Sequence, residues 1–299
     1  MKLLISGANG FLGSHFISFF KNMSVDIYTV GTKPISGNEK NFININSLSK
    51  ENFKNFVNSN ISYFIHLTGN PSLKDKNQND YVNCDLGIKL LKFINEISFK
   101  KDVKCVFFGS AAEYGKIDAR SNPVSELHST TPKNYYGIAK NTQTKKALDL
   151  GKERGNVFVL RPFSILGEGM PLTSAFGSFF YQIFKRKAKI LKTGNLNVYR
   201  DFIDIKDLVF LTWKLMQNEE SYGKIINICS GKPIILREMV KFIIEQAQFS
   251  IEINEMVDFN SLNENDIIYG NNSLLISLID EFNFINWKTT LKRISGYYK

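Results

Sequence analysis

The sequence predicts an α/β protein with a doubly wound parallel sheet and a smaller α/β lobe in its C-terminal half. Three observations predict this class. Short apolar runs alternate with longer helical patterns over residues 1–160. A glycine-rich turn follows the first apolar run and opens the first helical pattern. Beyond Pro162, glycines and prolines interrupt the alternation. We therefore expect one domain over residues 1–163 and a second over 164–299, from which about 223–240 returns to the sheet.

Each predicted strand is a short apolar run, as expected for parallel strands that are buried on both faces. In the first domain these runs are Lys2–Ser6, Val25–Val30, Phe42–Ile45, Ser62–Leu67, Val103–Phe108 and Asn156–Leu160. Apolar residues at helical spacing predict helices over Gly13–Met23, Tyr81–Ser98 and Tyr136–Arg154. In the second domain we expect a Phe-rich helix ending near Lys187, a strand over Gly223–Cys229 and a helix over Leu236–Gln248.

The composition is that of a packed globular protein with a basic surface. The chain has 299 residues, of which 43% are hydrophobic and 22% charged, and its formal net charge is +10. A positive balance attracts nucleic acids, membrane surfaces and phosphorylated small molecules alike. Because the basic residues are scattered, we expect no nucleic-acid partner, with RNA binding as the alternative. The chain opens directly into a strand and contains no stretch apolar enough for a bilayer, which predicts a cytoplasmic protein without a membrane partner.

The cysteines and histidines suggest neither a disulfide framework nor a metal site. The 3 cysteines, Cys84, Cys105 and Cys229, lie far apart, and an odd, sparse count favours a reducing compartment. No Cys/His spacing is typical of a metal site, so we expect no metal. We expect His15 and His66 to pack in or beside the fold.

The segment Gly7-Ala8-Asn9-Gly10-Phe11-Leu12-Gly13 lies between the first predicted strand and the first predicted helix. Glycine permits a positive φ and lets the backbone approach a pyrophosphate. Free N–H groups and the helix dipole then hold the phosphates. The spacing differs from the commoner G-x-G-x-x-G, and a plain tight turn is the alternative. Because strand, turn and helix occur in the required order, we predict a Rossmann dinucleotide site with Gly7, Asn9, Gly10, Phe11, Leu12 and Gly13 as cofactor contacts.

The end of the second predicted strand bears on the choice of cofactor. An acidic residue there would bind the ribose 2′-hydroxyl of NAD. This chain has Gly31-Thr32-Lys33-Pro34, and no carboxylate follows until Glu39. Thr32 and Lys33 therefore favour the 2′-phosphate of NADP. NAD remains the alternative, in which Lys33 is an ordinary solvated lysine.

A Tyr-x-x-x-Lys pair, Tyr136 and Lys140, predicts an acid–base group. On a helix the two side chains share one face. An ammonium group beside a phenol favours the phenolate and lowers its pKa from about 10. The tyrosine then exchanges a proton with a carbonyl or alcohol oxygen. Ser110, at the end of the fifth predicted strand, could hydrogen-bond the same oxygen. Tyr181 and Lys185 fit the pattern too, but no such strand end precedes them.

The glycine loop, Ser110 and Tyr136-x-x-x-Lys140 together resemble the extended short-chain dehydrogenase/reductase family, whose members act on nucleotide-sugars. Segments along most of the chain add to the resemblance, namely 64–69, 83–91, 160–163 and 200–207. It implies that Ser110, Tyr136 and Lys140 are catalytic, with Tyr136 as proton donor and Lys140 as electrostatic helper and ribose ligand. It also implies a homodimer. Further implied cofactor contacts are Leu67, Thr68, Gly69, Asn83, Tyr136 and Pro162, and implied substrate contacts are Ala111, Ala112, Ser164 and Arg200.

Residues that the chain lacks narrow the reaction within this family. Sugar 4,6-dehydratases carry an acid pair just after the catalytic Ser/Thr, and GDP-fucose-forming epimerase-reductases carry a cysteine two residues after it. Here those positions are Ala111 and Ala112, which supply neither group. A 4-ketoreductase and a 4-epimerase remain, since both need only the Ser/Tyr/Lys set.

The C-terminal half favours reduction. The segments 226–233, 237–238 and 270–273 resemble GDP-4-keto-6-deoxy-mannose reductases. The resemblance departs at Ser164, where asparagine is usual, and at Glu168, where proline is usual. It implies NAD(P)H-dependent reduction of the C4 keto group of a nucleotide-linked 4-keto-6-deoxy sugar, a step of deoxysugar and surface-polysaccharide biosynthesis. The alternatives are a nucleotide-sugar 4-epimerase with tightly bound NAD and a non-catalytic NADP-binding sensor.

Overall fold

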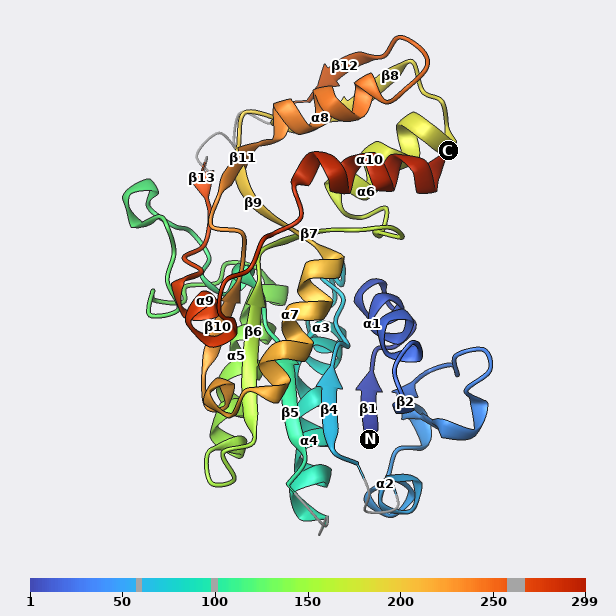
Figure 1. Ribbon diagram of the computed structural model, residues 1–299, viewed down its shortest axis with the longest axis vertical. Coiled ribbons are helices and arrows are strands. Elements are labelled where there is room, and N and C mark those ends of the chain that lie inside the picture. Colours follow the sequence, from blue (N-terminus) through green and yellow to red (C-terminus); the bar gives the residue numbers. More distant parts are fainter. Residues whose placement is uncertain (58–60, 98–101, 257–266) are drawn as a thin grey trace. The chain divides into compact units, whose positions relative to one another are not determined.

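A computed structural model describes residues 1–57, 61–97, 102–256 and 267–299, which form two compact units (Figure 1). The first unit comprises Met1–Gly115, Thr130–Arg161 and Val209–Ile226. The second comprises Lys116–Ser129, Pro162–Leu208 and Asn227–Lys299. The units alternate along the sequence, so the division into residues 1–163 and 164–299 stays a proposal about domains.

The first unit is built on the predicted doubly wound sheet, which has seven strands in the order β10-β6-β5-β4-β1-β2-β3. All pairs from β3 across to β6 are parallel. The strand order reverses between β1 and β4, and ligands of such sheets bind at the carboxyl ends beside this reversal. The strands are β1 (Lys2–Ser6), β2 (Asp26–Gly31), β3 (Phe42–Asn44), β4 (Tyr63–His66), β5 (Lys104–Phe108), β6 (Val157–Pro162) and β10 (Ile225–Ile228).

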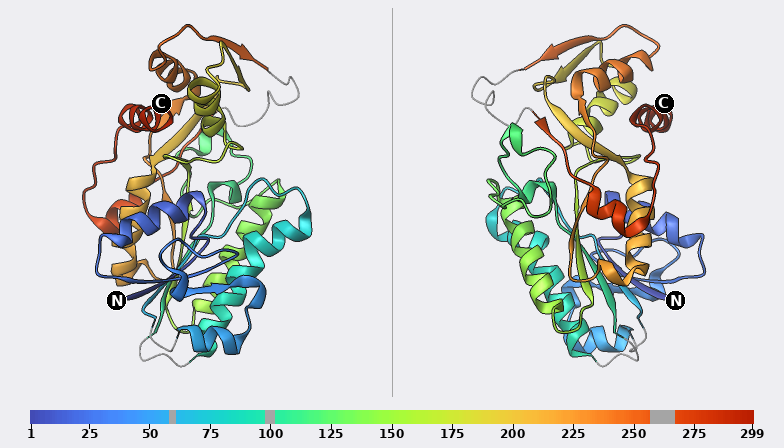
Figure 2. Two further views of the ribbon diagram at one scale, coloured as in Figure 1. Left: turned by 90° about the vertical axis from the view of Figure 1, so that its right-hand side faces the viewer. Right: turned by 60° about the vertical axis from the view of Figure 1, so that its left-hand side comes forward.

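Helices cover both faces of this sheet (Figure 2). On one face lie α1 (Phe11–Lys21) and α7 (Ile205–Gln217), where the rings of Phe20 and Trp213 meet edge to face at 5.5 Å. On the other face lie α2 (Lys50–Val57), α4 (Leu86–Glu96) and α5 (Tyr135–Gly151). Buried side chains of these helices, among them Phe53, Leu90 and Ala147, form one apolar cluster with Leu4 and Phe64 of the sheet.

Two predicted helices differ in detail from the observed ones. The helix predicted over Tyr81–Ser98 consists of a π-helical turn, Tyr81–Asp85, continued by α4, and it follows the short helix α3 (Lys76–Asp80). Its last predicted residue, Ser98, lies outside the described residues. Helix α5 begins at Tyr135 because the side chain of Asn134 accepts a hydrogen bond from the N–H of Gly137, at 2.8 Å.

The second unit contains two small sheets and four α-helices among its described residues. The larger sheet joins β11 (Pro233–Ile235), β9 (Tyr199–Asp204), β13 (Ile267–Ile268) and β7 (Ser164–Leu166). The smaller pairs β8 (Ile190–Thr193) with β12 (Glu252–Glu255). The helices are α6 (Ala175–Phe180), continued by a π-helical turn over Tyr181–Lys185, α8 (Leu236–Glu245), α9 (Ser273–Ile279) and α10 (Trp287–Tyr298).

Buried carboxylates fix β9 near both of its ends. Asp201 accepts hydrogen bonds from the backbone N–H groups of residues 230, 231 and 270. Asp204 binds the guanidinium group of Arg293 on α10, with Nη1–Oδ2 at 2.8 Å. The same guanidinium group pairs with Glu168, at 2.5 Å from Nε to Oε1. Glu168, which departs from the family pattern, thus joins the chain after β7 to α10.

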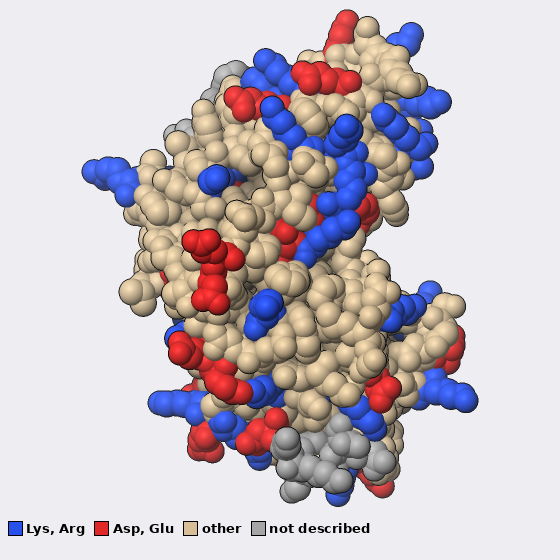
Figure 3. Space-filling model, in the orientation of Figure 1, with Lys and Arg blue, Asp and Glu red and all other residues tan. Residues whose placement is uncertain are grey.

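Three further features concern the charge of the surface, the length of the helices and the state of the cysteines. On the face shown in Figure 3, Lys and Arg side chains gather over α10, which exposes Lys288 and Lys292. None of the helices in the described part of the chain combines the length and the hydropathy that a membrane span needs. All three cysteines are buried as free thiols.

Candidate active site

Glycines 7 and 13 are required by the close packing of the loop after β1. Gly7 has a φ of +76°, and a Cβ atom there would lie 2.7 Å from the backbone nitrogen of Thr68. A Cβ atom at Gly13 would lie 2.2 Å from the carbonyl oxygen of Gly7. Gly10 precedes α1, and no described side chain caps this helix or places a carboxylate in its first turn. The N–H groups of the first turn are therefore available to an anion.

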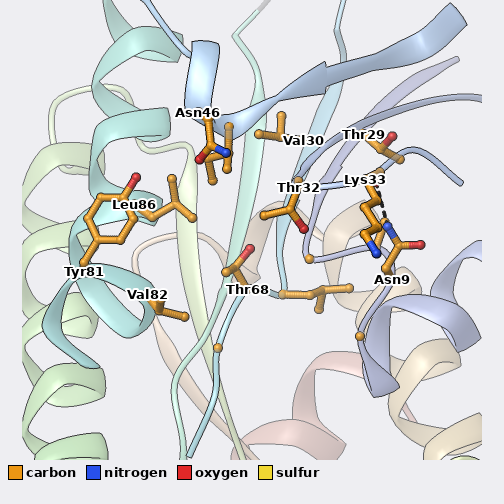
Figure 4. A pocket seen from close by; sticks show the side chains of 17 residues that line it. Asn9, Thr29, Val30, Thr32, Lys33, Asn46, Thr68, Tyr81, Val82 and Leu86 are labelled. Carbon is orange, nitrogen blue, oxygen red and sulfur yellow. Dashed lines mark hydrogen bonds between the residues drawn. The ribbon is translucent and has the colours of Figure 1, made fainter. Parts of the chain in front are cut away.

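A pocket of about 470 Å³ opens beside this loop, at the carboxyl ends of β1, β2 and β4 (Figure 4). Asn9, Thr32 and Lys33 lie on one side of it, and Tyr81, Val82 and Leu86 lie on the other. The amide nitrogen of Asn9 donates to the carbonyl oxygen of Lys33 at 2.7 Å, which joins the two loops. Of the predicted cofactor residues, the pocket is lined by Gly7, Asn9, Gly10, Thr32, Lys33, Leu67, Thr68 and Gly69.

The lining suits a dinucleotide. A pocket of this size with mainly apolar walls and a few polar groups is typical of a cofactor site. The polar groups, including Thr32, Lys33 and Asn46, are amides, hydroxyls and one ammonium, and no carboxylate occurs among the described lining residues. The sequence reading missed Ile45 and Asn46, although they directly follow the third strand and therefore reach the same edge of the sheet.

Several predicted cofactor residues are not part of the pocket lining. Asn83 is fully buried and braces the turn after β4: its Oδ1 accepts from the N–H of Asn70 at 2.7 Å, and its Nδ2 donates to the Asn70 carbonyl at 3.1 Å. The others outside the lining are Phe11, Leu12, Gly13, Tyr136, Lys140 and Pro162. Their contacts with a cofactor stay predictions.

Helix α5 brings Tyr136 and Lys140 to the strand end that carries Ser110. The hydroxyl groups of Ser110 and Tyr136 are hydrogen-bonded to each other. The Nζ of Lys140 donates to the carbonyl oxygen of Phe108 at 2.8 Å and to Oε1 of Gln143 at 3.1 Å. A Cβ atom on Gly69 would lie 3.4 Å from that Nζ, so Lys140 lies directly against the pocket wall. The predicted triad and the pocket therefore adjoin within the first unit.

The pKa of Tyr136 is raised to about 12, chiefly because protein atoms surround its hydroxyl group. The hydrogen bond from Ser110 lowers this pKa, and the negative charge of Glu113 raises it. Burial lowers the pKa of Lys140 to about 8. The expectation that Lys140 depresses the pKa of Tyr136 is thus wrong for this structure. Burial is the main cause of the raised pKa, and the Lys140 ammonium group is bound by the Phe108 carbonyl and Gln143.

A buried ion pair behind Ser110 was not predicted. Ser110 begins a 3₁₀ turn, Ala111–Glu113, and the Glu113 carboxylate accepts from the Ser110 N–H at 2.9 Å. It also accepts from the Thr144 hydroxyl at 3.0 Å and pairs with Arg161 at 2.9 Å. The signal for the first contact was available, because Ser-x-x-Glu is the pattern of a capping box.

Four further residues were predicted as substrate contacts. Ala111 and Ala112 form the turn after Ser110 and are partly exposed. In the second unit, Ser164 begins β7, while Arg200 lies on β9 and donates to the Tyr199 carbonyl at 2.8 Å. The substrate contacts of these four residues stay predictions.

Both histidines that were expected to pack in or beside the fold do so. The half-buried His15 ring meets the Phe11 ring edge to face at 5.6 Å. His66 is fully buried, with its Nδ1 at 2.7 Å from the Ser6 hydroxyl. The second Tyr-x-x-x-Lys match, Tyr181 and Lys185, forms the π-helical turn after α6 in the second unit, where the Arg186 guanidinium lies over the Tyr181 ring at 5.5 Å.

Comparisons with known proteins agree with this arrangement. The model of the NAD dependent epimerase/dehydratase family matches residues 3–229. The GDP-6-deoxy-D-mannose reductase of Pseudomonas aeruginosa is 27% identical over 63% of this chain, a match that spans 64% of that protein, just under two thirds. The GDP-6-deoxy-D-talose 4-dehydrogenase of Aggregatibacter actinomycetemcomitans is 24% identical over 98% of this chain and 97% of its own length. The structure of RMD from Pseudomonas aeruginosa complexed with NADPH superimposes with a TM-score of 0.84 at 22% identity, over 99% of this chain and 98% of the other, and so shares the fold.

Proposed function

Because the chain belongs to the NAD dependent epimerase/dehydratase family, we propose that it is an oxidoreductase that uses NADPH to reduce the C4 keto group of a nucleotide-linked 4-keto-6-deoxy sugar. The observation on which this rests is the Ser110–Tyr136 hydroxyl pair beside a pocket whose described lining residues include no carboxylate. The similarity to a GDP-6-deoxy-D-mannose reductase supports the same reaction.

The residues of the first unit suit the donation of a proton to a ketone. When bound, NADPH supplies the hydride. Ser110 and Tyr136 donate hydrogen bonds to the carbonyl oxygen, and Tyr136 passes its proton to that oxygen as the alcohol forms. Since its pKa is raised to about 12, Tyr136 is a phenol at neutral pH and has this proton to give. Lys140, whose Nζ lies against Gly69, would bind the ribose of the cofactor.

The same property favours a reductase over an epimerase. A 4-epimerase begins by removing a proton from a sugar hydroxyl, which requires Tyr136 as a phenolate. The raised pKa of this half-buried phenol, to which the nearby carboxylate of Glu113 contributes, opposes that form. For the whole protein we propose a cytoplasmic homodimer that takes a nucleotide-diphosphate sugar in deoxysugar and surface-polysaccharide biosynthesis, with Ser164 and Arg200 among its substrate contacts.

The test is NADPH oxidation with a panel of GDP-, dTDP-, CDP- and UDP-linked 4-keto-6-deoxy sugars, followed at the nicotinamide absorbance band. We expect one nucleotide to support turnover and NMR to identify the product as the C4 alcohol. Interconversion of C4 epimers without net oxidation of cofactor would assign an epimerase instead. Tight NADPH binding with no turnover of any sugar would assign a sensor.

Lys33 is predicted to select NADPH. Replacement of Lys33 by alanine removes the one ammonium among the described pocket residues. We expect the Kd for NADPH to rise about tenfold and the Kd for NADH to stay unchanged, because only NADPH carries the 2′-phosphate. Fluorescence titration of both cofactors measures this, with Lys54→Ala, an exposed lysine on α2 outside the pocket lining, as the matched control. Equal losses for both cofactors would contradict the assignment.

A further inference from the structure

The carboxylate of Glu113 is completely buried and connects three elements of the first unit. Its Oε1 accepts from the Ser110 N–H at 2.9 Å and from the Thr144 hydroxyl at 3.0 Å. Its Oε2 accepts from Nε and Nη2 of Arg161, each at 2.9 Å. The partners come from the turn after β5, from α5 and from β6, so a single side chain joins the elements around the predicted triad.

Thr144 links Glu113 to the face of α5 that carries Tyr136. Tyr136, Lys140 and Thr144 are spaced by four residues and share one face of the helix. The Thr144–Glu113 contact therefore fixes the face that carries Tyr136, while the Ser110–Glu113 contact fixes the turn that carries the second hydroxyl. Side chains that donate or accept protons must be held within a fraction of an ångström to act together.

The protein is also built closely around this carboxylate. A Cβ atom on Gly109 would lie 2.2 Å from Oε1 of Glu113, so only glycine leaves room for it. The Arg161 guanidinium lies over the ring of Tyr114 at 4.8 Å, and both residues are buried. An ion pair in such a place is often no more stabilising than apolar side chains of the same volume. Its presence next to Ser110 is therefore better explained by the site than by stability.

We propose that Glu113 is a positioning residue, which holds the Ser110 turn and α5 in register and places a fixed negative charge behind the Ser110–Tyr136 pair. This inference rests on the proposed function. Glu113 does not line the predicted cofactor pocket. In the proposed role it does not touch the reacting atoms and acts through Ser110 and Tyr136.

The charge of Glu113 acts on two titratable side chains of α5, Tyr136 and Lys140. The negative charge of Glu113 raises the pKa of Tyr136 and the pKa of Lys140. Among the described residues, the titratable or charged groups around this cluster include Arg161 on β6, Tyr114 against its guanidinium group, Lys140 on α5, Cys84 before α4 and His66 on β4. Removal of the carboxylate charge should therefore lower the pKa of Tyr136, so that the phenol is lost at a lower pH.

The experiment uses Glu113→Gln, which keeps the shape and one acceptor oxygen but removes the charge. We expect kcat for ketone reduction to fall about tenfold or more, because the substitution disturbs the groups that transfer the proton. The KM for the keto-sugar and the Kd for NADPH should stay within about threefold of the wild type. We expect the basic limb of the pH profile to move to lower pH. The midpoint of the Tyr136 tyrosinate absorbance in a pH titration should also move to lower pH. The signal of Tyr136 is identified as the part of the absorbance that is missing in Glu113→Gln/Tyr136→Phe.

Two further variants separate charge from packing. Glu113→Asp keeps the charge with a shorter reach, so it should restore the pH profile and only part of kcat. Thr144→Val removes one hydrogen bond and leaves the carboxylate, so it should lower kcat less and leave the tyrosinate midpoint in place. A folded Glu113→Gln protein with the wild-type kcat and tyrosinate midpoint would overturn the proposal.

The test remains decisive in two other cases. If Glu113→Gln does not fold, Glu113→Gln/Arg161→Gln removes both buried charges. The tyrosinate signal should then shift in the same direction but by less, because loss of the Arg161 cation opposes the effect of losing Glu113. If no nucleotide-sugar is turned over, the proposed function fails, but the tyrosinate titration still reports whether Glu113 controls Tyr136. An unshifted titration there overturns the inference by itself.

Discussion

Replacement of Tyr136 by phenylalanine is expected to lower kcat for ketone reduction by about 10²- to 10⁴-fold, the usual range for loss of a general acid. The ring remains, so α5 keeps its packing, but the proton donor and its hydrogen bond with Ser110 are gone. NADPH affinity should change by less than about threefold, because Tyr136 lies outside the lining of the cofactor pocket. Stopped-flow reduction of the keto-sugar and fluorescence titration of NADPH measure the two quantities separately.

The chain supplies its own matched control in Tyr181→Phe. Tyr181 has the same sequence pattern, with Lys185 four residues later, but it lies in the π-helical turn after α6 of the second unit. We expect this variant to keep the wild-type kcat. Similar losses in both variants would show that the phenylalanine exchange acts through folding, and wild-type activity in Tyr136→Phe would remove Tyr136 from the reaction.

The pattern of apolar runs was sufficient to predict the sheet of the first unit. Parallel strands buried on both faces leave continuous apolar runs, and these located β1, β4 and β5 to within one or two residues. The glycine loop was predictable for a related reason: a strand, a tight turn and a helix start are all local features. Local side chains then set the boundaries: Asn134 caps α5, which begins at Tyr135, one residue before its predicted start.

The parts of the site that the sequence did not reveal depend on contacts between distant residues. Glu113 is separated in sequence from Thr144 by 31 residues and from Arg161 by 48 residues. No local sequence pattern predicts these two contacts. The pKa of Tyr136 was predicted in the wrong direction for the same reason. A Tyr-x-x-x-Lys spacing predicts that an ammonium group is near, but the burial that raises the pKa of Tyr136 follows only from the packed structure.

The second large effect is expected at the loop that the sequence did identify. Gly13 lies in the first turn of α1, where alanine is normally about 1 kcal/mol better than glycine for helix stability. Here a Cβ atom would lie 2.2 Å from the Gly7 carbonyl oxygen and 2.6 Å from backbone atoms of Ala8. Backbone atoms cannot rotate aside as a side chain does. We therefore expect Gly13→Ala to destabilise the protein by about 1–3 kcal/mol, as overpacking does, and to raise the Kd for NADPH about tenfold or more.

Two other glycines distinguish this steric effect from a general effect of alanine. At Gly10 a Cβ atom would lie 3.2 Å from the Gly7 carbonyl oxygen, so Gly10→Ala should weaken NADPH binding less than Gly13→Ala. Gly296 lies in α10 with nothing within 4 Å of its Cβ position, so Gly296→Ala should raise stability by about 0.5–1 kcal/mol and leave NADPH binding unchanged. Chemical denaturation and cofactor titration of the three variants give the order. A Gly13→Ala protein that is more stable than the wild type and binds NADPH normally would contradict this prediction. The loop would then have room for a Cβ atom, and its close packing would not determine the conformation of the phosphate site.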